Sequence, residues 1–530
     1  MINTVRIKAS SQNMTPLIYD ILSSTAPKDE TVLEFEKGTY YFSREGSREF
    51  DLFSSGGRSV KNHVVFPVLD KRDLTIRGNG SEFVFCDRLQ PFVFQDCSGI
   101  KLENFAVDYA FLRYAYGTVA DATQEGFELR MDREKFDYFV EGNCLCFRCG
   151  QDVLSTRVRK LSCKRIAPGK SGIYFLYIGD TEAPAYTAAP NVRIDAEETE
   201  EGVFFRYRKE SPKVCFEAGD TICLAYDNER EAQAFWFENC RDICLENVSI
   251  YRSGGMGVVA DICEDIRINN LQIGIKPGRE EFYSTTADGI FLTNCKGYFQ
   301  LRNSSIFNTY DDAMNIHGFY TFVEEILSQT QVRVGYRHTS HWGLIPCKAG
   351  DVLHVSTEDT YDEIGTAEVK AVFVSSDRRE MVLTLEDTGM LSPGMLLENP
   401  DRMPEVLIEG NTVRNCPHMR LSAGSMTIRN NCLELNDTDI YINDLISFWG
   451  ESGAARNVKI SGNRFGRAGG YNIMVKSSRP ESANRLHQRI TIEGNQFVLP
   501  REKALNISAV RELVETNNVF SEGSGYDQNL

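Results

Sequence analysis

A short phrase built around asparagine recurs along the chain and constrains the fold more than any other feature. Each copy joins an alternating apolar strand, a polar corner and a second short strand, as in ICLENVSI around Asn247 and ITIEGNQF around Asn495. The phrase asparagines are Asn79, Asn104, Asn247, Asn270, Asn303, Asn411, Asn431, Asn463, Asn495 and Asn518. Most neighbours in this series are separated by roughly 20 to 33 residues, which is the spacing of solenoid repeats. We therefore expect one solenoid through most of the 530 residues.

The alternation inside each phrase predicts β-strands, because successive strand side chains point to opposite faces. Turn residues fill the space between these strands, without a helical period. Asparagine suits the corners because it tolerates left-handed backbone angles and can form amide ladders. The predicted fold class is all-β, a right-handed parallel β-helix.

Two spacings between phrases are much longer than the rest, the first from Asn104 to Asn247 and the second from Asn303 to Asn411. The stretches within them alternate like strands but lack the asparagine phrase, as in GIYFLYIG and QVRVGY. They predict two inserted antiparallel β-barrel or sandwich modules. The expected organisation is an N-terminal cap with the first coils in 1–110, an insert in 111–232, central coils in 233–320, a second insert in 321–400 and final coils in 401–530.

Two smaller patterns concern the open end of the solenoid and its core. The segment from Thr15 to Leu22 carries a proline in its first turn and an apolar stripe, which predicts a helix that closes the open end. Cys97, Cys240 and Cys263 each lie at the same distance before a phrase asparagine. This recurrence favours a buried ladder of structural thiols.

No histidine, cysteine or glycine-rich motif points to a metal or a cofactor. The seven histidines lack the spacings of zinc sites, and Cys144, Cys146 and Cys149 in CLCFRC have no second paired cluster. The segment APGKSG around Lys170 lacks the first glycine of a phosphate-binding loop. We expect no bound metal and no cofactor.

The charge balance narrows the range of partners. With 75 acidic and 58 basic side chains, the net charge is −17, and this field repels nucleic acid, anionic membranes and polyuronates. No apolar run long enough to span a membrane and no secretory leader stands in the sequence. The expected localisation is cytoplasmic, or secreted if a leader has been removed. A homo-oligomer is compatible with the sequence.

Three aspartates form the pattern most suggestive of chemistry. Asp288 precedes Asp311 by the same spacing that separates Asn247 from Asn270, which is one coil of the solenoid, and Asp312 follows directly. Because adjacent parallel strands lie roughly 4.8 Å apart, we expect the three carboxylates in one small patch. Carboxylates this close raise one another's pKa and destabilise a fold, which is typical of a metal site or a reaction centre.

Acid–base catalysis is the favoured interpretation of this patch. One carboxylic acid can protonate a leaving oxygen while a carboxylate activates water, as in glycoside hydrolysis. A calcium site and ordinary corner residues of the β-helix are the alternatives. Tyr310, Asn315, His317 and Trp449 supply the aromatic faces and hydrogen-bonding groups that a sugar needs.

The chain resembles glycoside hydrolase family 110, the exo-acting α-1,3-galactosidases. The motifs that carry the resemblance are STTADG, then YDDAMNIHG one coil later, with SGGMGV upstream and FWGESGAARNVKISGN downstream. The three-aspartate layout is similar to that of polygalacturonases too. The resemblance implies an inverting hydrolase that releases terminal α-1,3-linked galactose from a neutral carbohydrate, on a parallel β-helix with β-barrel insertions.

The same resemblance implies roles for individual residues. Asp311 would protonate the glycosidic oxygen, and Asp288 and Asp312 would hold and deprotonate the attacking water. Arg279, His317, Trp449 and Glu451 match family positions that bind sugar hydroxyls, and together with Asn315 they are the predicted substrate-binding residues.

The chain also departs from the family pattern. Phe291 stands where the family usually has histidine, and Arg420–Ala423 replaces an Arg-Gly-Ile-Leu phrase. We therefore expect kept catalytic aspartates and altered sugar contacts. The alternative functions are a calcium-dependent or polyuronate-processing β-helix enzyme and a non-enzymatic carbohydrate-binding solenoid.

Overall fold

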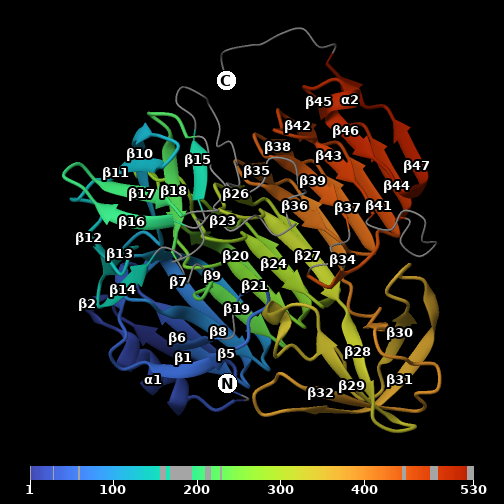
Figure 1. Ribbon diagram of the computed structural model, residues 1–530. Helices are drawn as coiled ribbons and strands as arrows, with labels where there is room; N and C mark the ends of the chain where they lie inside the picture. The colour runs from blue at the N-terminus through green and yellow to red at the C-terminus, as the bar shows by residue number, and fades with distance from the viewer. Residues whose placement is uncertain are drawn as a thin grey trace.

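Parallel strands stack coil upon coil through the body of the molecule (Figure 1). A 21-stranded sheet, which we call the phrase sheet, contains the asparagine phrases, and a 12-stranded second sheet runs with it. The computed structural model describes residues 2–27, 29–57, 60–155, 163–166, 194–208, 216–226, 230–443, 449–477 and 487–521. The predicted parallel β-helix is confirmed. No helix among these residues is long and apolar enough to span a membrane.

Each phrase forms one bent strand or two short strands that meet at its corner. The bent strands are β7 (Arg72–Phe85), β9 (Ser98–Tyr109) and β20 (Arg241–Ile250). The paired strands are β22 (Glu264–Asn269) and β23 (Gln272–Ile273), β25 (Lys296–Arg302) and β26 (Ser305–Phe307), β34 (Glu405–Glu409) and β35 (Thr412–Arg414), β37 (Ser425–Arg429) and β38 (Cys432–Glu434), β41 (Asn457–Ser461) and β42 (Arg464–Phe465), β44 (His487–Glu493) and β45 (Gln496–Phe497), and β47 (Val510–Thr516) and β48 (Val519–Phe520).

The second sheet supplies the opposing wall of the core. Its strands are β5 (Arg48–Leu52), β6 (Val60–Leu69), β8 (Gln90–Gln95), β19 (Phe235–Glu238), β21 (Val258–Asp261), β24 (Ile290–Thr293), β27 (Met314–Phe319), β36 (His418–Leu421), β39 (Thr438–Ile442), β43 (Ile473–Val475) and β46 (Leu505–Ile507), together with β40 (Glu451–Ser452), which pairs antiparallel with β27. Alternate residues such as Ile290 and Leu292 join the hydrophobic core. The residues between them point away from the core, as strand geometry requires.

The phrase asparagines have two structural roles along the solenoid: some take left-handed backbone angles, and others form a side-chain ladder. In the first coils Asn79, Asn104, Asn247, Asn270 and Asn303 take positive φ angles of 49° to 59° at the corners. From the coil of β34 onward, the positive φ falls on the preceding residue, for example Gly410 or Asn430. The phrase asparagine then bonds its neighbours in a ladder through Asn411, Asn431, Asn463, Asn495 and Asn518. Both properties expected of asparagine are therefore present, and they coincide at Asn247 and Asn270, where the Asn270 amide donates to the Asn247 side chain at 2.7 Å.

Two antiparallel modules interrupt the solenoid and lie on either side of β24 and β27 (Figure 1). The first has a six-stranded sheet of β10 (Tyr114–Ala122), β11 (Gly126–Arg130), β15 (Cys163–Ile166), β16 (Ile194–Glu198), β17 (Val203–Tyr207) and β18 (Thr221–Ala225), with a smaller sheet of β12 (Tyr138–Glu141), β13 (Cys144–Cys149) and β14 (Asp152–Ser155). The second is a closed barrel of β28 (Thr321–Ile326), β29 (Gln331–Tyr336), β30 (Val352–Ser356), β31 (Glu363–Val374), β32 (Met381–Leu385) and β33 (Leu396–Glu398). The expected inserts are confirmed, whereas the five domain bounds stay a prediction. Lys170 and the stretch GIYFLYIG lie outside the described residues.

The N-terminal end is closed as expected. Helix α1 (Thr15–Ser24) buries Ile18 and Leu22 in the solenoid core, beside the first coils formed by β1 (Asn3–Ile7), β2 (Ser10–Asn13), β3 (Thr31–Phe35) and β4 (Thr39–Phe42). The backbone N–H of Cys97 points to the Cys240 sulfur, and that of Cys240 to the Cys263 sulfur, each at 3.4 Å. The cysteines therefore form the buried ladder that their spacing predicts.

Replacing Asn463 by alanine tests the ladder. Its side chain joins Asn431 to Asn495 and donates to the Ile428 carbonyl, so the change leaves buried polar groups without partners. We expect the free energy of unfolding to fall by about 1–3 kcal/mol in urea denaturation. The control is Asn457→Ala, an exposed asparagine of the same coil. Equal losses in the two variants would contradict the ladder's role.

Candidate active site

The three aspartates lie on loops that lead into two neighbouring strands of the second sheet, β24 and β27. These strands pair with Ile290 opposite Met314, and the N–H of Gly289 donates to the carbonyl of Asp312 at 2.8 Å. Asp288 is therefore level with Asp312, and Asp311 is level with Ala287. The expected register, which stacked Asp288 on Asp311, is wrong by one position.

The same local turn shapes both loops. The hydroxyl of Thr285 donates to the Ala287 carbonyl, and the hydroxyl of Thr309 donates to the Asp311 carbonyl, both at 2.7 Å. Thr285 and Thr309 also pair in a parallel bridge. The first loop thus has Ala287 at the position where the second loop has Asp311. Asp311 is therefore an additional carboxyl beside the stacked pair of Asp288 and Asp312.

The surroundings of Asp288 favour its neutral form. Only 2% of the residue is exposed, and its Oδ1 has no hydrogen-bond partner among the described residues. Burial, followed by the charges of Asp311 and Asp312, raises its pKa well above the ordinary value. The positive charges of Arg230 and Arg420 oppose this shift without cancelling it.

Asp312 is held in the opposite form. Its Oδ1 lies 2.9 Å from Nε2 of His418, and its Oδ2 accepts a hydrogen bond from Nε of Arg420 at 3.2 Å. Burial opposes the charge of Asp312, but the charges and hydrogen bonds of His418 and Arg420 outweigh it and lower the pKa. Two stacked carboxyls with divergent proton affinities are the arrangement that separates an acid from a base.

Asp311 is the most exposed of the three, with 18% of its side chain accessible. Its carboxylate forms an ion pair with the guanidinium of Arg230, which precedes β19. Arg230 also donates to the carbonyl of Gly56 at 3.1 Å. The carboxyl group nearest to solvent is thus bound to a cation from another coil.

Asn315 and His317 lie on the outward face of β27. Asn315 pairs across the sheet with Arg420, and its Oδ1 has no partner within the described part of the chain. His317 is buried, with Nδ1 against the Gly318 carbonyl at 2.7 Å and Nε2 3.7 Å from Glu451. The structure therefore groups these three predicted residues on and beside the strand that follows Asp311 and Asp312.

Trp449 reaches the same region through the barrel. Its ring lies 4.2 Å from that of His338, which follows β29. Burial and then the charge of Arg230 lower the pKa of His338, so His338 lies within electrostatic reach of Arg230. Trp449 is thus linked to the barrel side of the site through its contact with His338.

Arg279 occupies a different environment. Its guanidinium forms a two-pronged ion pair with Asp108, at 3.0 and 2.7 Å, and lies 3.7 Å from Glu281. Among the contacts of the described residues, none joins Arg279 to the three aspartates. The sugar-binding role of Arg279 stays a prediction.

The side chains that contact the carboxyls of Asp311 and Asp312 were not predicted as site residues. They are Arg230, His418 and Arg420. Arg230 stands in an insert-flanking stretch without a repeat phrase, so no local signal marks it. His418 and Arg420 alternate on β36 and therefore share one face. That alternation, one coil beyond β27, is a signal that could have found them.

Within the described ranges, no group of three or more His, Cys, Asp or Glu side chains could hold a metal ion. The guanidinium groups of Arg230 and Arg420 instead pair with Asp311 and Asp312.

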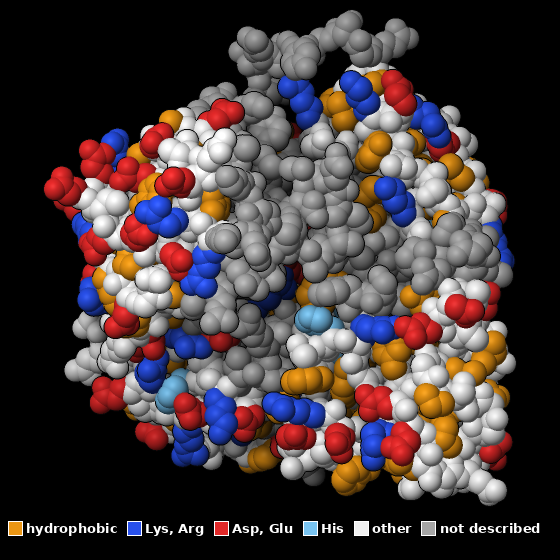
Figure 2. All heavy atoms as spheres, viewed as in Figure 1, with side chains coloured by type: hydrophobic (Ala, Val, Ile, Leu, Met, Phe, Trp, Pro, Cys, Tyr) orange, Lys and Arg blue, Asp and Glu red, His pale blue; other side chains and the backbone are white. Residues whose placement is uncertain are grey.

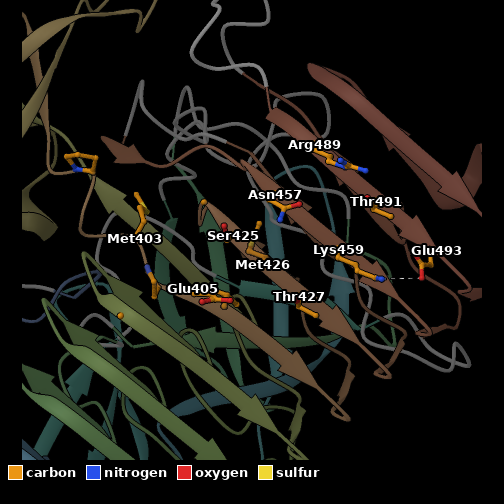
Figure 3. A pocket seen from close by; sticks show the side chains of 15 residues that line it. Met403, Glu405, Ser425, Met426, Thr427, Asn457, Lys459, Arg489, Thr491 and Glu493 are labelled. Carbon is orange, nitrogen blue, oxygen red and sulfur yellow. Dashed lines mark ion pairs between the residues drawn. The ribbon is translucent and has the colours of Figure 1, made fainter.

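A separate groove of about 830 Å³ lies on the outer face of the phrase sheet (Figure 3). Its floor is a polar ladder across neighbouring strands, and Lys459 and Glu493 form an ion pair in it at 3.2 Å. None of the predicted site residues lines it. On the face shown in Figure 2, acidic and basic side chains are interspersed over the first insert and the barrel.

Paired substitutions test the opposite charge states of Asp288 and Asp312. Because the folded pKa of Asp288 is raised, the unfolded chain loses this proton first, and stability falls as the pH rises above about 4. Asp288→Asn should therefore raise the melting temperature, with a larger gain at pH 8 than at pH 5.

Asp312→Asn should have the opposite effect. The folded pKa of Asp312 is lowered, so its contribution is present above the unfolded pKa and is lost as the pH falls through the folded pKa. The melting temperature should drop at pH 8, and the drop should shrink at acid pH. Shifts of the same sign in both variants, measured by circular dichroism, would contradict the assignment.

Comparison with known proteins adds a relationship along the whole chain. No family model matches the sequence. Alpha-1,3-galactosidase B of Bacteroides thetaiotaomicron is 24% identical over 97% of this chain and 84% of its own length. Alpha-1,3-galactosidase A of Shewanella woodyi is 26% identical over 98% of this chain and 85% of its own length.

Solved structures show much weaker similarity. A polygalacturonase from Erwinia carotovora aligns over 98% of this chain and 93% of its own, with a TM-score of 0.40 and 10% identity. The parallel β-helix therefore rests on the strand pairings themselves. The resemblance to α-1,3-galactosidases that the aspartate motifs indicate is confirmed as sequence similarity through most of the chain.

Proposed function

We propose that the protein is an exo-acting, inverting glycoside hydrolase that releases terminal α-1,3-linked galactose. The observation that carries the proposal is the stacked Asp288–Asp312 pair of divergent proton affinity with Asp311 beside it. Similarity to proteins named alpha-1,3-galactosidase over nearly the whole chain supports the substrate class.

The charge states suggest how the three carboxyls divide the reaction. Asp312, kept ionised by His418 and Arg420, would accept the proton of the attacking water, and Asp288 would hold that water by donating its own proton in a hydrogen bond. Asp311, which is the most exposed, would protonate the glycosidic oxygen. Donation therefore requires Asp311 to take up a proton from solvent when substrate binding opens the Arg230–Asp311 ion pair, while Arg230 stays bound to the Gly56 carbonyl.

The surroundings suit a neutral sugar. Asn315 offers an amide oxygen without a described partner, and Trp449 offers an aromatic face at the barrel side. Phe291 packs edge-on against His317 at 5.2 Å, so an apolar contact stands where the family usually has a polar one. The net charge of −17 disfavours a polyuronate.

Changing Asp311 to asparagine tests the acid. The variant loses the proton that the leaving oxygen needs, so kcat for an α-1,3-galactobiose substrate should fall by about 10²-fold or more. The melting temperature should stay within a few degrees of the wild type, because losing the Arg230 ion pair offsets relief from the other two carboxyls.

The control for that variant is Asp70→Asn, an exposed corner aspartate with a positive φ of 55° that asparagine also accepts. It should keep full activity. If Asp311→Asn hydrolyses as fast as Asp70→Asn, Asp311 is a corner residue and not the acid. Cleavage of polygalacturonate but not of α-1,3-galactosides by the wild type would overturn the substrate class.

A further inference from the structure

We propose that Asp261 and the segment Ser54–Gly57 form a positioning device that holds Arg230 against Asp311. This inference rests on the proposed function. Asp261 ends β21, and the segment follows β5, near the N-terminal end of the solenoid. Neither belongs to the motifs that suggested the reaction.

Asp261 anchors the segment through several buried hydrogen bonds. Its Oδ2 accepts from the Ser55 N–H at 3.0 Å and from the indole N–H of Trp236 at 2.8 Å, and its Oδ1 accepts from the Ser55 hydroxyl. That hydroxyl also lies 3.0 Å from the hydroxyl of Thr293. Both Asp261 and Ser55 are fully buried, so water cannot replace these partners.

Gly56 connects the anchored segment to Arg230. It has a positive φ of 63°, and a β-carbon there would lie 2.5 Å from Met256 and 3.0 Å from Phe291. The segment is therefore pressed onto the outward face of the second sheet. In this position the Gly56 carbonyl accepts from Nη1 of Arg230, whose other nitrogen, Nη2, pairs with Asp311.

A second set of bonds fixes the backbone of Arg230. The side-chain amide of Gln233 donates to the Arg230 carbonyl at 2.8 Å, and its oxygen accepts from the Met256 N–H at 2.6 Å. With its backbone carbonyl and one guanidinium nitrogen both held, Arg230 keeps its other nitrogen against Asp311. Rigid placement of this kind decides how well a reacting group is oriented.

Stability alone does not account for the carboxyl of Asp261. Burying an acid is unfavourable, and an apolar side chain of similar size would fill the same space without desolvating a carboxyl. Burial raises the pKa of Asp261 to about 7, against the hydrogen bonds from Ser55 and Trp236. The carboxyl instead fixes the position of the loop relative to the sheet. Its oxygens accept from Trp236 on β19 and from Ser55 in the loop, which are far apart in sequence.

Asp439 gives a matched control. It is also fully buried on the second sheet, accepts hydrogen bonds from Asn436 and Asn472, and has its pKa raised by burial to about 7. None of the described hydrogen bonds joins it to Arg230 or to the three aspartates. A general loss of stability should therefore affect Asp439→Asn as much as Asp261→Asn.

The first measurement is hydrogen exchange in the full-length protein. In Asp261→Asn only one atom of the amide can accept, so the Ser55 N–H and the Ser55 hydroxyl can no longer both donate to this side chain. Exchange of a peptide spanning residues 52–57 should therefore speed up by roughly 10-fold or more, while Asp439→Asn leaves it unchanged. Unchanged exchange at Ser55 in Asp261→Asn would overturn the anchor, whether or not the protein hydrolyses galactosides.

The second measurement is kcat/KM for an α-1,3-galactoside in a double-mutant cycle. Asp261→Asn should lower kcat/KM roughly 10- to 100-fold, and Asp439→Asn less than about 2-fold. In an Arg230→Gln background, Asp261→Asn should add less than about 2-fold, because the residue through which it acts is gone. Equal losses in both backgrounds would overturn the positioning role, whereas an inactive wild type would overturn the proposed function instead.

Discussion

The parallel pairing of β24 with β27 is the contact on which the candidate site depends. Its register, with Ile290 opposite Met314, places Asp288 level with Asp312 and leaves Asp311 beside them. A slip of one position would exchange the outward and inward faces of a strand, turning Asn315 and His317 into the core and Ile316 out of it. The hydrophobic core therefore fixes the positions of the polar residues that lie outside it.

The three carboxyls are tolerable because each is treated differently. Burial raises the pKa of Asp288, whereas Asp312 lies against His418 and Arg420, and Asp311 is paired with Arg230. With these surroundings, the described residues hold three neighbouring carboxyls without needing a metal ion to offset their charges. It also explains how a chain with a net charge of −17 can gather more carboxyls at one point.

Much of the fold could be predicted from the sequence because each coil repeats the same local rules. The phrase alone indicates strand, corner and coil length, and the gaps in its spacing mark the inserts. The phrase does not predict which position of the corner its asparagine occupies. Asn303 and Asn411 look equivalent in sequence but occupy different positions of the corner. The matched turns at Thr285 and Thr309 would have given the correct register for the aspartates.

The surroundings of the aspartates could not be predicted in the same way. Arg230 lies 81 residues before Asp311, and Arg420 lies 108 residues after Asp312, beyond the second insert, so their approach depends on tertiary packing. Conversely, Arg279 matches a family motif, yet its described partners are Asp108 and Glu281. Local periodicity predicts what a residue's backbone does, whereas charge partners depend on which coils meet.

The most direct test of the account is the anomeric form of the first product. Proton NMR during hydrolysis of an α-1,3-galactoside reports which anomer appears before mutarotation equilibrates the two. Water activated by Asp312 on the face opposite the leaving group predicts β-galactose first. Initial appearance of α-galactose would contradict an inverting reaction at these aspartates.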